Sequence, residues 1–377
     1  MSNTPTNEFP FIMTTTPDTT EFSFEISAAG KFVIDWGDGN IEKIDKNKTG
    51  KQTISHSYNN AGAHKIKLGG KATRYDSCYT AINFHKNLDL AKIDGSLGQI
   101  FSTLSDGTQP RFGSLWYWHG TFQECTNLTG SIPENLFAGV SGAPAKAMFI
   151  NTFYGCSNLT GSIPEKLFAG VSGAPAYGVF IQTFNGCSGL TGSIPEKLFA
   201  GVSGAPAEYM FTTTFKGCSG LTGSIPEKLF AGITGAPASS MFSFTFKGCS
   251  GLTGSIPENL FAGISGAPAE DMFRNTFDGC SRLTGTMDKL GNIKNNKASS
   301  AVTATKKESK PVVAPEFTPM PDMGMTGTIS VDIKISGITP DDLAKIIQMA
   351  CSVCNKPNIQ ITSDIVKHAQ QNNLNQR

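Results

Sequence analysis

Six cysteines recur at intervals of 31 residues through the middle of the chain, at positions 125, 156, 187, 218, 249 and 280. A phenylalanine stands three residues before each cysteine, and a leucine stands three residues after it. The phrase GCSGLTGSIPEKLFAG occurs twice, letter for letter, at 186–201 and 217–232. A fixed period of this length predicts a solenoid, in which each unit contacts mainly the units before and after it. One unit has too few large apolar side chains to offset the entropy of ordering its backbone, so stacking must supply the missing contacts.

The second half of each unit has the pattern of an amphipathic helix. In the copy that contains Cys218, an Ala-Pro dipeptide predicts a helix over 206–217, since proline suits the first helical turn. Met210, Phe211 and Phe215 fall with that cysteine at helical spacing, and the glycine before the cysteine ends the helix.

The first half of each unit predicts a strand followed by a shorter helix. Residues 221–225 place two apolar side chains on one face of an extended segment, and the next proline opens a helix over 226–232. The fold class predicted for 81–287 is therefore an α/β solenoid of the leucine-rich-repeat type, with parallel strands on one face and helices on the other. Residues 93–125 form a degenerate repeat that caps its N-terminal end.

The phrase Thr-Phe-x-Gly-Cys-Ser-x-Leu-Thr-x-x-Ile-Pro resembles the leucine-rich repeats of BspA-like bacterial surface proteins. The resemblance covers about residues 93–287. The present unit is longer by roughly the segment Ala-Gly-Val-Ser-Gly-Ala-Pro, which affects the expected curvature. The resemblance implies a solenoid with a surface-binding or adhesive role.

Differences between the copies concentrate on the longer predicted helix. Two interpretations are open: a solvated face whose residues vary freely, or a recognition face of varied side chains on a rigid scaffold. A third surface, the ladder of hydroxyl groups represented by Thr191 and Ser193, offers contacts to a repetitive glycan. The candidate recognition residues are Lys146, Asn151, Tyr154, Tyr177, Gln182, Asn185, Glu208, Tyr209, Thr213, Lys216, Ser240, Lys247, Glu270, Asp271, Arg274 and Asp278.

The repeat cysteines predict a ladder of buried thiols, because a buried cysteine behaves as a small apolar residue. Disulfides and metal ligation are the alternatives, but zinc ligands usually cluster two to four residues apart, whereas these cysteines are 31 apart.

The chain before the repeats reads as an all-β domain. Apolar residues alternate at 22–26, 32–36 and 66–68, which predicts strands of a sandwich over 20–80, after an extension over 1–19. The turn Asp35-Trp-Gly-Asp38-Gly, with His-x-Tyr at 56–58, resembles the Ig-like PKD-type domain. The two aspartates are predicted to cap their own turn, with calcium binding as the alternative.

The chain after the repeats predicts a flexible linker over 288–326 and a small α+β domain over 327–377, which could anchor the protein or dock it to an assembly. Its Cys351-Ser-Val-Cys354 stands near the C-terminal end of a predicted helix. Redox motifs stand at the opposite end of a helix, where the dipole lowers the thiol pKa, so a structural role is favoured over redox or zinc chemistry.

Composition and motifs favour a binding protein over an enzyme. The formal net charge is +1, from 31 basic and 30 acidic residues, so no nucleic-acid partner is predicted. No apolar run is long enough to span a membrane. The five histidines have no catalytic or metal-ligand spacing with Cys, Asp or Glu, so no cofactor is predicted.

The sequence therefore predicts a non-enzymatic surface or secreted protein that presents its solenoid to a protein or a glycan. The first residues, MSNTPTNEFPF, lack the basic and apolar regions of a secretory signal. The alternative is a structural or receptor-binding component of a phage particle or another assembly.

Overall fold

The computed structural model describes residues 9–114, 119–287 and 293–294. Strands and turns make up this part of the chain. Its strands are β1 (Phe11–Thr15), β2 (Glu21–Ile26), β3 (Ala29–Asp35), β4 (Ile41–Lys46), β5 (Gln52–Ser57), β6 (Lys65–Arg74), β7 (Ile82–Asn83), β8 (Leu90–Gly95), β9 (Gly254–Ser255), β10 (Leu283–Thr284), β11 (Thr286–Met287) and β12 (Ile293–Lys294). The predicted linker, apart from β12, and the predicted domain at 327–377 with its CxxC motif lie outside the described residues.

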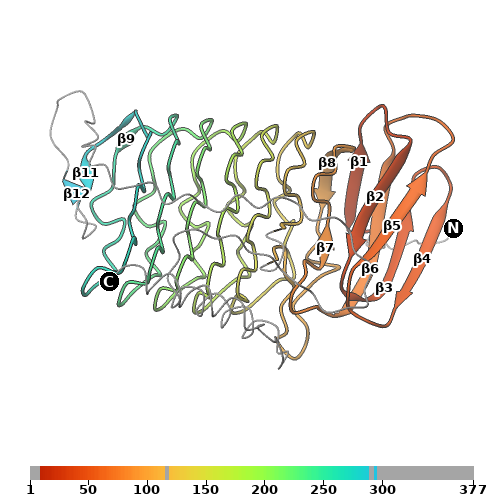
Figure 1. The fold of residues 1–377 in the computed structure, drawn as a ribbon, viewed down its shortest axis with the longest axis horizontal. Coiled ribbons are helices and arrows are strands. Elements are labelled where there is room, and N and C mark those ends of the chain that lie inside the picture. Colours follow the sequence, from red (N-terminus) through yellow and green to blue (C-terminus); the bar gives the residue numbers. More distant parts are fainter. Residues whose placement is uncertain (1–8, 115–118, 288–292, 295–377) are drawn as a thin grey trace, which may run out of the picture. The chain divides into compact units, whose positions relative to one another are not determined.

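The first eight strands form two antiparallel sheets. One sheet has the order β4-β3-β6-β1-β8 and the other has the order β5-β2-β7 (Figure 1). Strand β2 shows why the sequence folds this way: Phe22, Phe24 and Ile26 are buried, while the residues between them face outward. Strand β1 comes from the segment predicted as an N-terminal extension, and β7 and β8 come from the segment predicted to begin the solenoid. One hydrophobic core runs without interruption from Phe11 in the first sheet to Leu283 in the last repeat.

The α/β prediction for the solenoid is wrong, because no helix occurs among the described residues. The repeats wind into coils of 31 residues, stacked side by side (Figure 1). Over 206–217, where the sequence predicts a helix, the backbone makes a series of tight turns. The N–H of Thr214 donates to Phe211, three residues back, and the N–H of Phe215 donates to Thr245 in the next coil. The shorter predicted helix at 226–232 is also a run of turns with bonds to the third residue back, such as Leu229 to Pro226.

Residues with a left-handed backbone conformation, in which φ is positive, interrupt the segment that is predicted as the longer helix. Ala147 and Asn151 have φ values of 52° and 53°, and Gly155 has 73°, so every fourth residue is left-handed. Each of the three is the third residue of a four-residue turn, the position where a type II turn requires a positive φ. A segment that repeats its geometry every four residues points residues four apart in the same direction, as an α-helix nearly does. The apolar spacing that predicts a helix therefore fits both structures.

We call the equivalents of residues 146–156 in each coil the turn segment. Every second N–H of a turn segment donates to a carbonyl in the next coil, for example Phe149 to Val179 at 2.9 Å and Asn151 to Ile181 at 3.0 Å. The intervening N–H groups bond locally, as Ile150 does to Ala147. Isolated parallel bridges such as Gly142 to Val171 connect the coils elsewhere. In place of the predicted parallel sheet, the coils share only isolated bridges and the two-residue parallel pair β9–β10.

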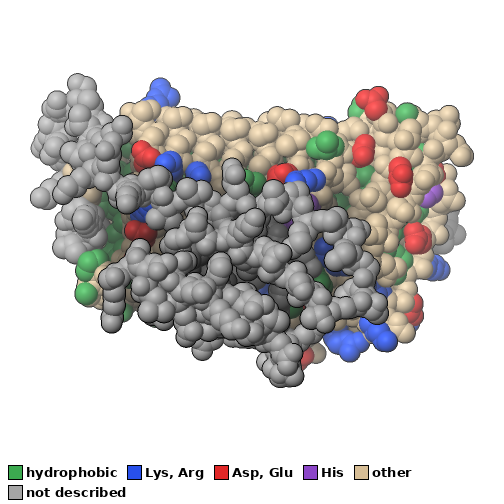
Figure 2. Space-filling model, in the orientation of Figure 1, with side chains coloured by type: hydrophobic (Ala, Val, Ile, Leu, Met, Phe, Trp, Pro, Cys, Tyr) green, Lys and Arg blue, Asp and Glu red, His purple; other side chains and the backbone are tan. Residues whose placement is uncertain are grey.

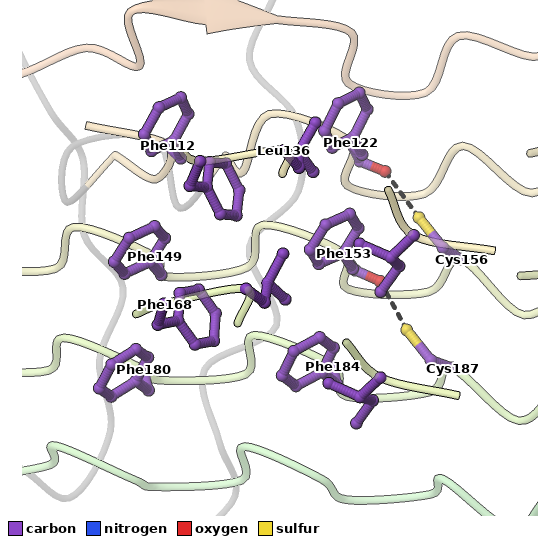
Figure 3. Close-up of a cluster of buried hydrophobic side chains, with 14 of the residues drawn as sticks. Phe112, Phe122, Leu136, Phe149, Phe153, Cys156, Phe168, Phe180, Phe184 and Cys187 are labelled. Atoms are coloured by element: carbon purple, nitrogen blue, oxygen red, sulfur yellow. Dashed lines mark hydrogen bonds between the residues drawn. The ribbon is translucent and has the colours of Figure 1, made fainter. Parts of the chain in front are cut away.

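Stacked phenylalanine rings fill the interior of the coils. Phe153, Phe184, Phe215 and Phe246 form one column, with ring centroids 5.6–5.7 Å apart and nearly parallel planes. Figure 3 shows the part of this column that contains Phe153 and Phe184. Two similar columns, through Phe180 and through Phe199, stand beside it. Rings of neighbouring columns tilt against one another, as for Phe180 and Phe199 at 4.6 Å. Offset and tilted contacts of this kind are favourable for aromatic pairs beyond the area that they bury.

The ladder of buried thiols is confirmed. All six repeat cysteines are free and buried. Each thiol from Cys156 onward donates to a phenylalanine carbonyl of the preceding coil, as Cys187 does to Phe153 at 3.0 Å (Figure 3). Burial raises the pKa of Cys125 and of Cys218 to about 12, so these thiols stay protonated and unreactive at neutral pH.

A ladder of buried threonines runs beside the thiols. The Thr214 hydroxyl lies 2.9 Å from the Phe180 oxygen and 2.8 Å from the Phe211 oxygen. The Thr-Phe-x-Gly-Cys phrase thus supplies a hydroxyl and a thiol that bond the preceding coil, which explains why these letters repeat.

The neighbouring residues Thr213 and Thr214 should respond oppositely to the same substitution. Thr213 is held at a φ of 54°, a conformation that a β-branched residue adopts at a cost and that asparagine tolerates. We expect Thr213→Asn to raise the free energy of unfolding by about 1 kcal/mol. Thr214→Asn should lower it by about 2 kcal/mol or more, since a larger amide must enter a filled site. Urea unfolding of both variants measures the difference, and a loss of stability in Thr213→Asn would contradict the assignment of strain.

Candidate recognition surface

The residues that vary between copies lie at equivalent positions of the turn segments, and inter-coil hydrogen bonds hold them in rows. The N–H of Gly186 donates to the Lys216 carbonyl at 2.8 Å, and the N–H of Gly217 donates to the Lys247 carbonyl at 2.7 Å. The row that contains these lysines therefore runs along the stack. We call the equivalents of residues 146, 147, 150, 151 and 154 in all coils the variable face.

The predicted candidates differ in exposure. Asn151, Asn185 and Thr213 are buried, with 3%, 7% and 8% of their surface exposed, so their side chains are not free to meet a ligand. Partly exposed are Tyr154, Tyr177, Gln182, Tyr209, Lys216, Ser240 and Lys247. Exposed are Lys146, Glu208, Glu270, Asp271, Arg274 and Asp278. The last four of these lie in the final coil.

The N-terminal part of the variable face contains an apolar and aromatic cluster. Ala147, Ile150 and Ile181 form a buried cluster that is separate from the core, and Tyr209 packs against it. The rings of Tyr177 and Tyr209 lie 5.5 Å apart at an angle of 54°. Burial, with a smaller contribution from Tyr209 and then Glu208, raises the pKa of Tyr177 to about 12, so its phenol remains a hydrogen-bond donor at neutral pH.

The C-terminal part of the variable face is charged. The Lys247 ammonium and the Arg274 guanidinium both lie 5.5 Å from the centre of the Phe244 ring. Lys247 pairs with Asp278 at 2.8 Å, and Arg274 pairs with Asp271 at 3.2 Å. These bonds hold long side chains in place around one aromatic ring, an arrangement that reduces the ordering cost of binding.

The Thr, Gly and Ser segment forms a different surface. The edge of the solenoid near β9 is mostly backbone and uncharged polar side chains (Figure 2). A shallow groove of about 590 Å³ lies there between Ser224–Glu227 and Gly254–Asn259. Because this segment hardly varies between copies, it offers the same groups at every coil.

The structure brings together two histidines, His85 and His119, whose spacing in the sequence does not indicate a site. His85 and His119 stack with ring centres 4.0 Å apart, in a groove of about 700 Å³ between β2, β5 and the first coil. Burial and then the neighbouring His119 lower the pKa of His85 to about 4, and burial lowers the pKa of His119. Both rings are therefore neutral at pH 7. The two histidines are 34 residues apart, a separation that matches no local motif, so only the stacking of the chain brings them together.

The aspartate turn of the sandwich behaves as predicted. Asp35 accepts the N–H of Gly37 at 3.0 Å, and Asp38 accepts the N–H of Asn40 at 3.0 Å. Each carboxylate thus caps its own turn. Asp35 also pairs with Lys67 at 2.7 Å, and Asp38 with His56 at 2.8 Å. Within the described ranges, no group of three or more His, Cys, Asp or Glu side chains is placed to hold a metal ion.

Comparisons with family models, with curated proteins and with solved structures find no match to this chain. The resemblance to BspA-like repeats and to PKD-type domains therefore remains a prediction from the quoted motifs. Among the described residues, no helix has the length and apolar character needed to cross a membrane.

Proposed function

We propose that this protein is a non-enzymatic binding protein, which recognises a protein or glycan ligand through the variable face of its solenoid. The observation that supports the proposal is a contrast between two sets of positions in each coil, one that recurs in the copies and one that varies. The phenylalanines of the columns, the buried threonines and the cysteines that connect the coils recur in the copies, whereas the positions of the variable face change from copy to copy.

The residue types on the variable face suit recognition. Tyrosine and arginine are over-represented among residues that dominate binding energy, because they combine apolar contact with hydrogen bonding. Tyr177 and Tyr209 supply such contacts at one end, and Phe244 with Arg274 supplies them at the other. A ligand that spans both parts would lie along the axis of the stack. The resemblance to BspA-like repeats suggests that this binding takes place at a cell surface or after secretion.

The test uses the full chain as a probe on an array of glycans and of proteins. For a ligand found there, Tyr177→Ala combined with Tyr209→Ala should weaken binding at least about tenfold, the loss expected for aromatic anchors. The matched control is Glu196→Ala with Lys197→Ala, two exposed residues of the Pro-Glu-Lys segment that stays constant between several copies. Thermal unfolding shows whether each variant keeps its fold. Equal affinity of the tyrosine variant, the control and the parent protein would exclude the variable face as the binding site.

A further inference from the structure

The hydrogen bonds between coils give the solenoid a direction. In each inner turn segment, five N–H groups at every second residue donate towards the C-terminal end of the stack. In the coil before the last, their acceptors are the carbonyls of the residues at 270, 272, 274, 276 and 278, at 2.7–2.9 Å. Within the turn segments, the inter-coil donors therefore face the C-terminal end and the acceptors face the N-terminal end.

The N-terminal end of the stack is closed by the chain itself. The N–H groups of Phe112, Phe122 and Glu124 donate to carbonyls of the first turn segment, at 2.6–2.9 Å. That capping segment is bonded in turn to the sandwich, for example through Phe84 N–H and the Thr121 carbonyl at 2.7 Å. No second molecule can add a coil at this end without displacing these residues.

The C-terminal end is open in the described part of the chain. No described residue accepts a hydrogen bond from the five equivalent N–H groups, which belong to Asp271, Phe273, Asn275, Phe277 and Gly279. Strands β11 and β12 pair with each other, and neither accepts a hydrogen bond from these five N–H groups. We call these five N–H groups the donor edge.

The donor edge presents only N–H groups, so a partner must present carbonyl groups to it. Two copies that meet end to end at this edge would oppose donors to donors. A head-to-tail contact needs a free acceptor end, which the capping segment has closed. A backbone with carbonyls at every second residue is complementary to the donor edge, as in strand addition to an exposed sheet edge. We propose that the donor edge binds an extended segment of a different polypeptide, whose backbone adds one further row of inter-coil hydrogen bonds to the solenoid.

The probe for the test is a synthetic peptide with the sequence of residues 205–219, which contain one complete turn segment in the folded protein. Amide hydrogen exchange of the full chain is measured with and without saturating peptide. In the free protein, the five donor-edge amides should exchange much faster than their equivalents at 240, 242, 244, 246 and 248. With peptide, their exchange should slow at least about tenfold.

A second peptide, which has the same sequence but contains three ester links, tests whether backbone carbonyls are the acceptors. Ester links after the residues that correspond to Met210, Thr212 and Thr214 weaken three of the carbonyls that would face the donor edge, and we expect at least about tenfold weaker binding. Lys247→Ala changes the variable face and should leave peptide protection unaltered, so a failure here is distinct from a failure of the proposed function.

Three results would overturn the proposal. The first is slow exchange of the donor-edge amides in the free protein, which would show that residues of the same chain already occupy the edge. The second is an absence of added protection with peptide. The third is equal binding of the amide and ester peptides, which would show that backbone acceptors do not determine the contact.

Discussion

Phe215→Ala should lower the free energy of unfolding by about 3–5 kcal/mol, one of the largest losses that a single substitution in this protein can cause. The Phe215 ring is fully buried and stacks on Phe184 and on Phe246, each at 5.6 Å. It also contacts Phe199 of the neighbouring column, with the ring centroids 6.2 Å apart. The cavity left by alanine is lined by rings from three coils, which cannot all move inward without breaking their own stacks.

The position of the ring in the stack provides the control. Phe277 occupies the same site in the last coil, is only partly buried, and stacks on Phe246 alone within its column. Phe277→Ala should therefore cost clearly less than Phe215→Ala when both are measured by urea unfolding. Equal losses at the two sites would show that contacts between coils contribute little, and would contradict the account of the core.

Gly201→Ala should destabilise the protein by about 3 kcal/mol or more, for a steric reason. A Cβ atom at Gly201 would lie 2.2 Å from the carbonyl oxygen of Val171 in the preceding coil. That contact is with backbone, so no side chain can rotate away. The Gly201 carbonyl also accepts the N–H of Gly173 at 2.8 Å, which fixes the spacing of the two coils.

Gly204 is the matched control for this substitution. It has a φ of 105°, but a Cβ atom added there would meet nothing within 4 Å. Gly204→Ala should cost only about 1–2 kcal/mol, the strain of a left-handed alanine. Thermal or urea unfolding separates the two effects, and a smaller loss for Gly201→Ala than for Gly204→Ala would mean that the coils are not this close.

The stacking of the repeats could be predicted from the sequence, but the local backbone could not. The 31-residue period, the buried cysteines and the parallel contacts follow from like residues lying beside like in successive coils. The predicted helices failed because a turn that repeats every four residues gives nearly the same apolar spacing as an α-helix. The residue types that favour a left-handed conformation indicate the difference: Gly178 stands at a position that alanine, tyrosine, serine and aspartate fill in the other copies, and Asn151 and Asn275 stand at the next left-handed position.

The candidate surface could be predicted in outline only. Comparison of the copies located the variable positions, because the phenylalanines, threonines and cysteines that form the columns and ladders recur in the copies. It could not predict that Asn151, Asn185 and Thr213 are buried, since exposure depends on where each turn directs its side chain. The stacked pair His85 and His119 also escaped prediction, because the contact depends on how the first coil meets the sandwich.

The central claim is that N–H groups of the turn segment bond to the next coil rather than within a helix. Trans-hydrogen-bond scalar couplings test it directly in protein labelled with ¹⁵N-phenylalanine and ¹³C-carbonyl methionine. Phe180 follows a valine, so its nitrogen has no covalent link to a methionine carbonyl, and its N–H donates to Met210 at 2.9 Å. We predict a coupling between the Phe180 nitrogen and the Met210 carbonyl carbon. If this segment were a helix, Phe180 would bond to Ala176, and no coupling to a methionine carbonyl would be observed.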